Sequence, residues 1–236
     1  MTEKLWYLSQ ISIFEALSDE EMAEIDQLNA IEHFNHIPKN TIVQTPETVR
    51  EGLFFVKEGK VRLYKLNAEG KQFTVSILGK GNMFGSLNAF SLGTSRVYIE
   101  TIEASFICSM SELKFEQLML GRPQLALKFM KVLSDQLADR EEQLEQLAFN
   151  DLRGRVIYLL ATLSTRFGIV QDDYVLIDLP LSHQEIANML GVTREAVSVI
   201  MRDLVKDGAI RTGRMSVQLA TSLLPNSHAT QALQKS

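Results

Sequence analysis

Residues 182–205 read SHQEIANMLGVTREAVSVIMRDLV, and they decide the fold of the C-terminal part of the chain. Ser182, with a glutamate three residues later, forms a capping box, which predicts that a helix begins there. Gly191 stands where a tight turn needs a positive φ, and Thr193 can cap a second helix. The small Ala187 allows the two helices to cross closely. The pattern predicts a helix-turn-helix; the alternative is a helical hairpin that does not contact DNA.

Both predicted helices have an apolar face: Ile186, Ala187 and Leu190 in the first, Val197, Ile200 and Leu204 in the second. In a helix-turn-helix the second helix enters the major groove with its first residues against base edges, where Arg suits guanine and Glu suits cytosine. The following DGAIRTGRMSVQL predicts a two-stranded wing with arginines for phosphates. The candidate DNA-contacting residues are Ser182, His183, Gln184, Thr193, Arg194, Glu195, Ser198, Arg202, Arg211 and Arg214.

Charge and composition restrict the class of protein. Residues 1–152 hold 15 Lys and Arg against 22 Asp and Glu, whereas residues 153–236 hold 9 against 7, so only the C-terminal third favours a phosphate partner. The single Cys108 excludes an intramolecular disulfide and a multi-Cys metal cluster within one chain. No apolar run approaches the roughly 18 residues that cross a membrane, and the N-terminus has no secretory pattern. We expect a cytoplasmic protein without membrane contact, metal or cofactor.

The N-terminal half has a β-rich pattern. Between residues 41 and 110 it contains the runs GLFFVKEG, KVRLYKL, QFTVSIL, YIETIE and SFICSMS. The glycines Gly59, Gly70 and Gly81 recur every 11 residues, which predicts a regular hairpin meander closed into an antiparallel barrel or jelly-roll. Residues 18–29 predict a short helix.

A long helix is predicted from Pro123 to about Asp151. Its apolar residues follow the alternating three- and four-residue steps of a heptad seam, interrupted by Arg140. Self-pairing is the favoured interpretation of so narrow a stripe, and packing on the chain's own sheet is the alternative. The candidate dimerisation residues are Met130, Leu133, Leu137, Leu144 and Leu147.

The fold class is therefore α+β. We expect a sensor domain of antiparallel β-roll type over residues 1–122, a dimerisation helix over 123–152, a winged helix-turn-helix over 153–225 and a polar tail over 226–236. In the third segment, a helix (RVIYLLATLSTRFG) and a short strand (YVLIDLPL) precede the helix-turn-helix.

Three stretches carry a resemblance to a known family. QEIANMLGVTREAVSVIMRDLVKDGAI resembles the recognition region of the CRP/FNR family of bacterial transcription regulators, and LAFNDLRGRVIYLL resembles the family's junction between dimer helix and DNA-binding domain. EGLFFVKEGKVRLYKLNAEGKQFTVSILGKGNMFGSL resembles the cyclic-nucleotide-binding β-roll. The resemblance implies a homodimer that binds a near-palindromic, TGTGA-like operator and recruits or blocks RNA polymerase. Family members often carry an Arg where this chain has Val199. We therefore expect a relaxed base preference at one position of the operator half-site.

The effector cassette departs from the family's pattern, which resembles Gly-Glu-Leu followed by an Arg and a hydroxyl residue. Ser86 replaces the Glu, Val97 replaces the hydroxyl residue, and Arg140–Glu141 replace the Thr–Ser pair of cAMP-responsive members. Each lost hydrogen bond to a buried ligand costs about 1–3 kcal/mol, so we expect another small-molecule effector or none. The effector residues that the resemblance implies are Gly85, Ser86, Leu87, Arg96, Val97, Arg140 and Glu141.

Three other functions are alternatives. The chain could be a ligand-binding regulatory protein that does not bind DNA, or a redox-responsive regulator that acts through Cys108, although a buried structural thiol is the plainer interpretation of that residue. An enzyme of the cupin type would need a His-rich metal set, and no His lies between Gly52 and Met110. We therefore expect no enzymatic activity.

Overall fold

The computed structural model describes residue 14 and residues 32–48, 51–88 and 90–224. The chain forms two compact units, Met1–Asp139 and Arg140–Ser236, and their boundary falls inside the long helix α4 (Pro123–Phe149). The helix predicted over 18–29 and the tail predicted over 226–236 lie outside the described residues. No helix among the described residues is long and apolar enough to cross a membrane.

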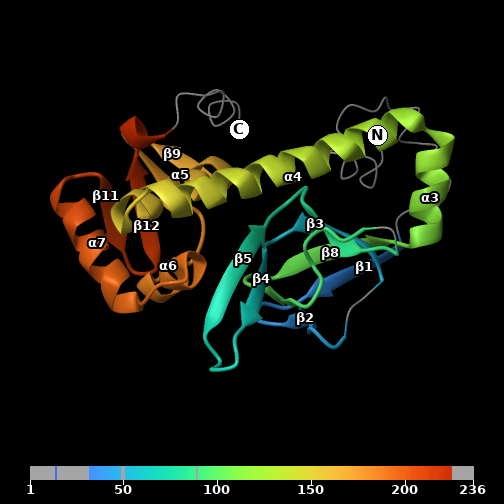
Figure 1. Cartoon of the computed structure of the whole chain (residues 1–236), viewed down its shortest axis with the longest axis horizontal. Helices are drawn as coiled ribbons and strands as arrows, with labels where there is room; N and C mark the ends of the chain where they lie inside the picture. Colours follow the sequence, from blue (N-terminus) through green and yellow to red (C-terminus); the bar gives the residue numbers. More distant parts are fainter. Residues whose placement is uncertain (1–13, 15–31, 49–50, 89, 225–236) are drawn as a thin grey trace. The chain divides into compact units, whose positions relative to one another are not determined.

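Two antiparallel four-stranded sheets build the N-terminal unit (Figure 1). Sheet A has the order β1 (Glu32–Ile37), β8 (Ser105–Met110), β3 (Gly52–Glu58), β6 (Met83–Ser86). Sheet B has the order β2 (Ile42–Gln44), β7 (Tyr98–Thr101), β4 (Val61–Leu66), β5 (Gln72–Leu78). The predicted β-roll is confirmed by this pair of packed sheets.

The predicted meander, however, is wrong in its connections. Gly59, Gly70 and Gly81 do lie at turns, with φ of 82°, 76° and 83°. Only the turn at Gly70 joins hydrogen-bonded neighbours, β4 and β5, whereas the other two turns pass from one sheet to the other. Glycine spacing therefore located the turns, but strand pairing depends on partners far away in the sequence.

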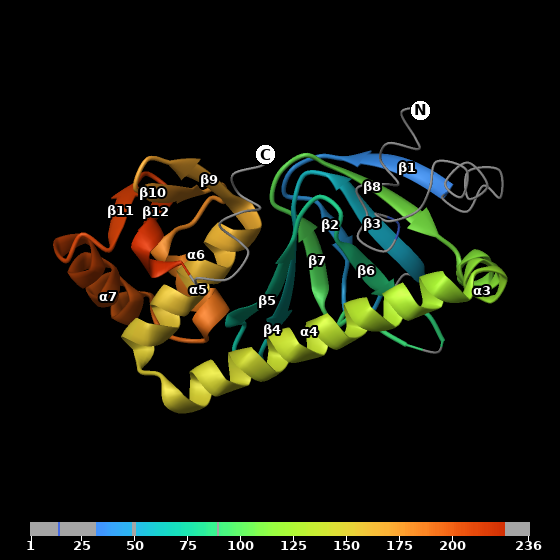
Figure 2. The same cartoon turned by 90° about the horizontal axis from the view of Figure 1, so that it is seen from above.

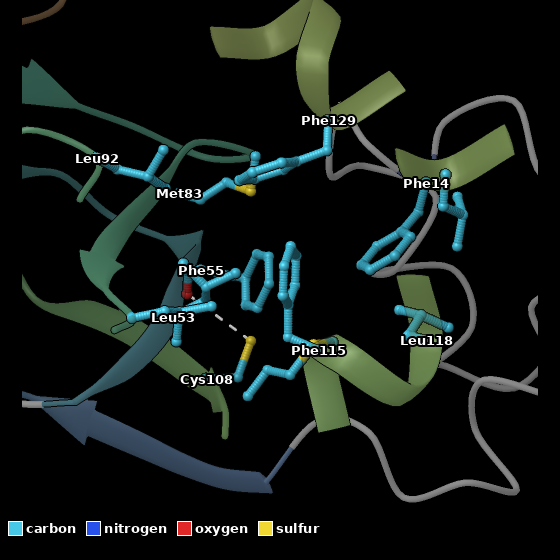
Figure 3. Close-up of a cluster of buried hydrophobic side chains, with 12 residues drawn as sticks. Phe14, Leu53, Phe55, Met83, Leu92, Cys108, Phe115, Leu118 and Phe129 are labelled. Carbon is cyan, nitrogen blue, oxygen red and sulfur yellow. Dashed lines mark hydrogen bonds between the residues drawn. The ribbon is translucent and has the colours of Figure 1, made fainter. Parts of the chain in front are cut away.

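Sheet A is apolar on both faces, because β3 has five consecutive buried residues, Gly52 to Val56. Phe54 and Val56 join the core between the two sheets, where Phe54 stacks on Phe84 at 5.3 Å between ring centroids. Leu53 and Phe55 join a second core beneath α3 (Glu112–Gly121) and α4 (Figure 3). The N-terminal unit thus has three layers: sheet B, sheet A and helices.

The start of α4 belongs to this second core. Leu125 and Phe129 are buried, and Phe129 packs against Phe90 and Phe115 with ring centroids 4.9 and 5.0 Å apart. Phe90 lies in the loop after β6, so the aromatic cluster joins that loop to both helices.

The C-terminal unit contains α5 (Leu152–Phe167), α6 (His183–Leu190) and α7 (Arg194–Lys206) beside a four-stranded antiparallel sheet C (Figure 2). Sheet C has the order β11 (Ile210–Gly213), β12 (Ser216–Ala220), β10 (Tyr174–Ile177), β9 (Gly168–Gln171), and a short 3₁₀ helix, Thr221–Leu223, follows. Strand β9 was not predicted, since its four residues GIVQ follow directly on the helical pattern of α5. The hairpin of β11 and β12 is the predicted wing.

Candidate functional site

The local signals of the helix-turn-helix are confirmed. Ser182 Oγ accepts from Glu185 N at 3.1 Å and caps α6. Gly191 ends that helix with φ of 70° and donates its N–H to Ala187 O. Thr193 Oγ1 accepts from Ala196 N at 3.3 Å and caps α7. Each of these bonds spans only three or four residues, which is why the sequence alone could locate the helix ends.

The packing of the two helices matches the prediction with one correction. Ile186, Ala187, Val197 and Leu204 are buried as expected, but Ile200 is only half-buried. Met201 takes the inner position instead, because residues at i, i+4 and i+7 from Val197 lie on one face of a helix. Leu190 is also half-buried.

Five of the DNA-contact candidates belong to α7 or cap it, and the others lie at the start of α6 and in the wing. Arg194, Ser198 and Arg202 follow one another at four-residue steps along one face of α7. Ser182, His183 and Ser198 are half-buried, and the remaining candidates are exposed: Gln184, Thr193, Arg194, Glu195, Arg202, Arg211 and Arg214. The exposed set contains four arginines and one glutamate, so this surface suits an anionic partner.

Two polar candidates are bound within the fold. Ser198 Oγ donates to Arg194 O at 2.8 Å and also lies 2.8 Å from His183 Nδ1. Gln184 donates from Nε2 to Asn188 Oδ1 at 2.9 Å. Ser198 therefore connects α6 to α7, which the sequence pattern did not predict.

A tyrosine outside the predicted set holds the wing. The guanidinium carbon of Arg211 lies 4.0 Å from the centre of the Tyr174 ring, and the Tyr174 hydroxyl donates to Gly208 O at 2.9 Å. Gly208 stands in the turn between α7 and β11, with φ of 71°. Tyr174 thus contacts both the wing arginine and the end of the second helix.

Two further arginines connect α5 to the helix-turn-helix. Arg155 donates to Leu190 O at 2.7 Å, at the end of α6. Arg153 forms an ion pair of 2.8 Å with Asp207, at the end of α7. The partners lie 35 and 54 residues apart in the sequence, so no local pattern could have identified these contacts.

In the effector cassette, three of the implied residues serve the packing. Gly85 has φ of 131°, and a Cβ atom there would lie 2.1 Å from Gly52 O. Leu87 and Val97 are buried, Leu87 in the core under the helices and Val97 in the core between the sheets. Ser86 is half-buried at the end of β6, while Arg96 is exposed with a left-handed φ of 57°.

The cassette loop uses its own hydrogen-bond donors. Leu87 N donates to Phe90 O at 2.9 Å, and Leu92 N donates to Gly85 O at 3.0 Å. Asn88 donates from its backbone N and from Nδ2 to the two carboxylate oxygens of Glu112, at 2.9 and 2.7 Å. An internal carboxylate at the start of α3 therefore takes donors that could otherwise bind an anionic ligand.

Two buried polar residues that the sequence did not single out close the base of this loop. Thr94 Oγ1 donates to Gly85 O at 2.7 Å, and Gln44 Nε2 donates to Thr94 O at 3.0 Å. Both side chains are almost fully buried, so these bonds are protected from water. They fix the loop between Gly85 and Val97.

The candidate seam on α4 remains largely exposed in the single chain. Met130, Leu137, Leu144 and Leu147 are between 55% and 64% exposed, whereas Leu133 is half-buried against the core under the helices. Arg140 and Glu141 are exposed, and Arg140 donates to Gln143 Oε1 at 2.9 Å. Packing on the chain's own sheet thus accounts for Leu133 but not for the rest of the seam.

Cys108 lies in the core under the helices (Figure 3). Burial raises the pKa of its thiol to about 11, and Sγ donates to Phe55 O at 3.7 Å. Among the described residues, no group of three or more His, Cys, Asp or Glu is placed to hold a metal ion.

Comparison with known proteins matches both halves of the chain. Residues 34–122 match the cyclic nucleotide-binding domain, and residues 154–223 match the Crp-like helix-turn-helix domain. The probable transcriptional regulator flp of Lacticaseibacillus casei is 28% identical over 209 residues, which cover 89% of this chain and 91% of that protein. The global nitrogen regulator of Synechocystis sp. is 30% identical over 161 residues, which cover 67% and 72%.

Among solved structures, a CooA mutant from Carboxydothermus hydrogenoformans has a TM-score of 0.69 and 30% identity, and the match covers 89% of each chain. The two relatives from the sequence comparison are named as regulators, the first of them as a transcriptional regulator, so the cupin alternative is wrong. Because the two domains match in the order in which the family carries them, and the match extends over most of each relative, the chain belongs to the CRP/FNR family of transcription regulators, which bind DNA through a helix-turn-helix.

Proposed function

We propose that the chain is a homodimer that binds a TGTGA-like palindrome in the bacterial cytoplasm, has RNA polymerase as a partner, and does not respond to cAMP. The observation that carries the proposal is the exposed start of α7, where Thr193 caps the helix and leaves Arg194 and Glu195 in solvent. Such a helix start is the part of a helix-turn-helix that meets base edges.

Arg194 and Glu195 suit a half-site with a G·C pair. Arg can bridge guanine O6 and N7, and Glu can accept from cytosine N4, each pair contributing about 1–3 kcal/mol of discrimination. Val199, half exposed on the same helix, has no hydrogen-bonding group for a base. We therefore expect a strict base preference at the base pairs that Arg194 and Glu195 contact. At one further base pair of the half-site we expect a relaxed base preference.

The homodimer is supported by the exposed seam of α4. Met130, Leu137, Leu144 and Leu147 recur at heptad spacing and present apolar surface in the single chain. A dimer places two recognition helices on one palindrome, since operator symmetry mirrors protein symmetry.

The test is fluorescence anisotropy with a labelled TGTGA-type palindrome and a scrambled duplex of the same composition. We expect tighter binding to the palindrome, and Glu195→Ala should relax preference at the C·G step while Arg214→Ala should weaken both duplexes alike. Asp135→Ala, at an exposed position of α4 in the other compact unit of the chain, is the control. Equal binding of both duplexes by the wild type, or unchanged base preference in Glu195→Ala, would contradict the proposal.

The absence of a cAMP response is supported by the cassette. Val97 is buried in the core, and Glu112 accepts both donors of Asn88. Isothermal titration calorimetry with cAMP should show no saturable binding in the micromolar range, and operator affinity should not change when cAMP is added. Saturable micromolar binding would overturn this part of the proposal.

The two remaining alternatives are less well supported. Membership of a family that binds DNA counts against a regulatory protein that binds only a ligand. Control by oxidation of Cys108 is disfavoured because thiolate is the reactive form, and burial raises the pKa of this thiol to about 11.

A further inference from the structure

A short hydrogen-bond chain connects the two helices that would meet DNA. Ser198 Oγ donates to Arg194 O at 2.8 Å and lies 2.8 Å from His183 Nδ1. A serine hydroxyl has one proton to donate and two lone pairs to accept with. Both contacts are hydrogen bonds at the same time only when Nδ1 carries a proton and Oγ accepts it.

The hydrogen bond between Nδ1 and Ser198 determines whether Nε2, on the other side of the His183 ring, can donate or only accept a hydrogen bond. Among the described residues, the His183 side chain makes no hydrogen bond or ion pair except the one with Ser198. Nε2 points away from Nδ1, and therefore away from Ser198. A neutral ring whose proton sits on Nδ1 has only a lone pair at Nε2, so it can accept there but cannot donate.

His183 is the first residue of α6, and the first helix of a helix-turn-helix crosses the DNA backbone. A phosphate there is a charged acceptor, so it repels the Nε2 lone pair of a neutral ring. Protonation of Nε2 turns the ring into a cation that donates a charge-assisted hydrogen bond.

We propose that His183 takes up one proton when α6 docks on the DNA backbone, and that Ser198 is the positioning residue that makes the proton necessary by holding Nδ1–H. This inference rests on the DNA-binding function proposed above. Ser198 then acts through His183 and does not itself read a base.

Charged side chains on α6 and on the two helices packed against it do not bond the ring. They include Glu185 on α6, Arg194, Glu195 and Arg202 on α7, and Arg155 on α5. Arg155 donates to Leu190 O, at the opposite end of α6 from His183. In the described part of the chain, none of these side chains forms an ion pair or hydrogen bond with His183. The phosphate is therefore the charged group that the His183 ring gains as a neighbour when DNA binds.

The sign of the pH effect follows from this contact. The phosphate stabilises the cation, so the bound protein holds the proton up to a higher pH than the free protein does. DNA affinity is then greatest at low pH and falls as the pH rises, because binding takes up a proton. For one proton the affinity changes by at most about tenfold per pH unit.

The test measures operator affinity by anisotropy between about pH 6 and pH 8.5 at constant ionic strength, the range in which histidine changes charge. Full-length wild type should lose affinity about threefold or more per pH unit. His183→Gln should show no such slope. Ser198→Ala keeps the histidine but releases Nδ1, so the neutral ring can carry its proton on Nε2 and donate without a second proton, and the slope should become clearly smaller. His36→Gln, in the β-roll, should retain the wild-type slope.

Each result decides a separate point. An equal slope in wild type and His183→Gln overturns the inference, and an unchanged slope in Ser198→Ala overturns the role of Ser198. A changed base preference in His183→Gln without a changed slope means that the ring reads a base, which also overturns it. No specific binding at any pH, in protein that circular dichroism shows to be folded, overturns the proposed function instead.

Discussion

Gly85 occupies a backbone position that no side chain can share. Its φ is 131°, and a Cβ atom would lie 2.1 Å from Gly52 O on the neighbouring strand. We expect Gly85→Ala to lower the free energy of unfolding by more than about 3 kcal/mol, through strain and displacement of β3. Gly70→Ala is the matched control, since φ is 76° there and nothing lies within 4 Å, so only the left-handed conformation costs about 1 kcal/mol. Urea denaturation followed by circular dichroism measures both, and equal losses would contradict the steric argument.

Cys108 should make stability depend on pH in the alkaline range. Burial raises the pKa of its thiol from 9.0 to about 11, so the unfolded chain loses the proton first. The resulting stabilisation is complete below about pH 9 and is lost as the pH rises to about 11, a change of about 2–3 kcal/mol. Denaturation of wild type and Cys108→Ala across this range provides the measurement. A parallel decline in both proteins would show that other groups cause it.

Single residues were predictable where their partners are local. Ser182, Gly191 and Thr193 satisfy backbone groups three or four residues away, so sequence spacing determines those contacts. The contact of His183 with Ser198 spans 15 residues and the contact of Arg155 with Leu190 spans 35. These depend on how the helices pack, and no spacing rule contains that information.

Among the elements, helix α4 offers the clearest test of assembly. At 1.5 Å per residue its 27 residues extend about 40 Å, and the seam residue Leu137 is 62% exposed. We expect Leu137→Glu to produce a monomer and weaken operator binding at least tenfold, because a charge at the seam cannot be buried against its symmetry mate. Ala138→Glu adds the same charge beside the seam and should remain dimeric. Light scattering after size-exclusion chromatography distinguishes them, and a dimeric Leu137→Glu would contradict the seam.

The wing depends on the ring of Tyr174. Tyr174→Leu removes the surface on which Arg211 rests and the hydroxyl bond to Gly208 O, while Tyr174→Phe removes only the hydroxyl bond. We expect Tyr174→Leu to reduce the salt dependence of operator binding by about one phosphate contact, and Tyr174→Phe to retain it. In the Arg211→Ala background, Tyr174→Leu should have little further effect. Additive losses would mean that Tyr174 does not act through Arg211.

Elements with a strong period were predicted and short ones were not. The helical pattern predicted α4 to within about two residues of its end. The alternating runs predicted β3, β4, β5, β7 and β8. Strand β9 was missed because its four residues become a strand only through pairing with β10. The crossings at Gly59 and Gly81 were missed for a related reason, since a turn looks the same whether its strands pair or separate.

At the scale of the whole molecule, the family and the two kinds of domain were predictable from three quoted stretches. The state of the effector cassette was only partly predictable. The substitutions at Ser86 and Val97 are visible in the sequence, but the carboxylate of Glu112 on the donors of Asn88 comes from 24 residues further along. Asn88 of this loop already donates to a carboxylate of the same chain, which the two substitutions alone do not indicate.

The two apolar faces of sheet A have a consequence for how such chains can be divided and recombined. A fragment cut before α3 would leave Leu53 and Phe55 facing water, so it would aggregate and not fold as an independent sensor. The start of α4 contributes Leu125 and Phe129 to the same core, yet later turns of that helix carry the seam. The smallest fragment of the N-terminal unit that keeps both faces of sheet A covered therefore ends inside α4.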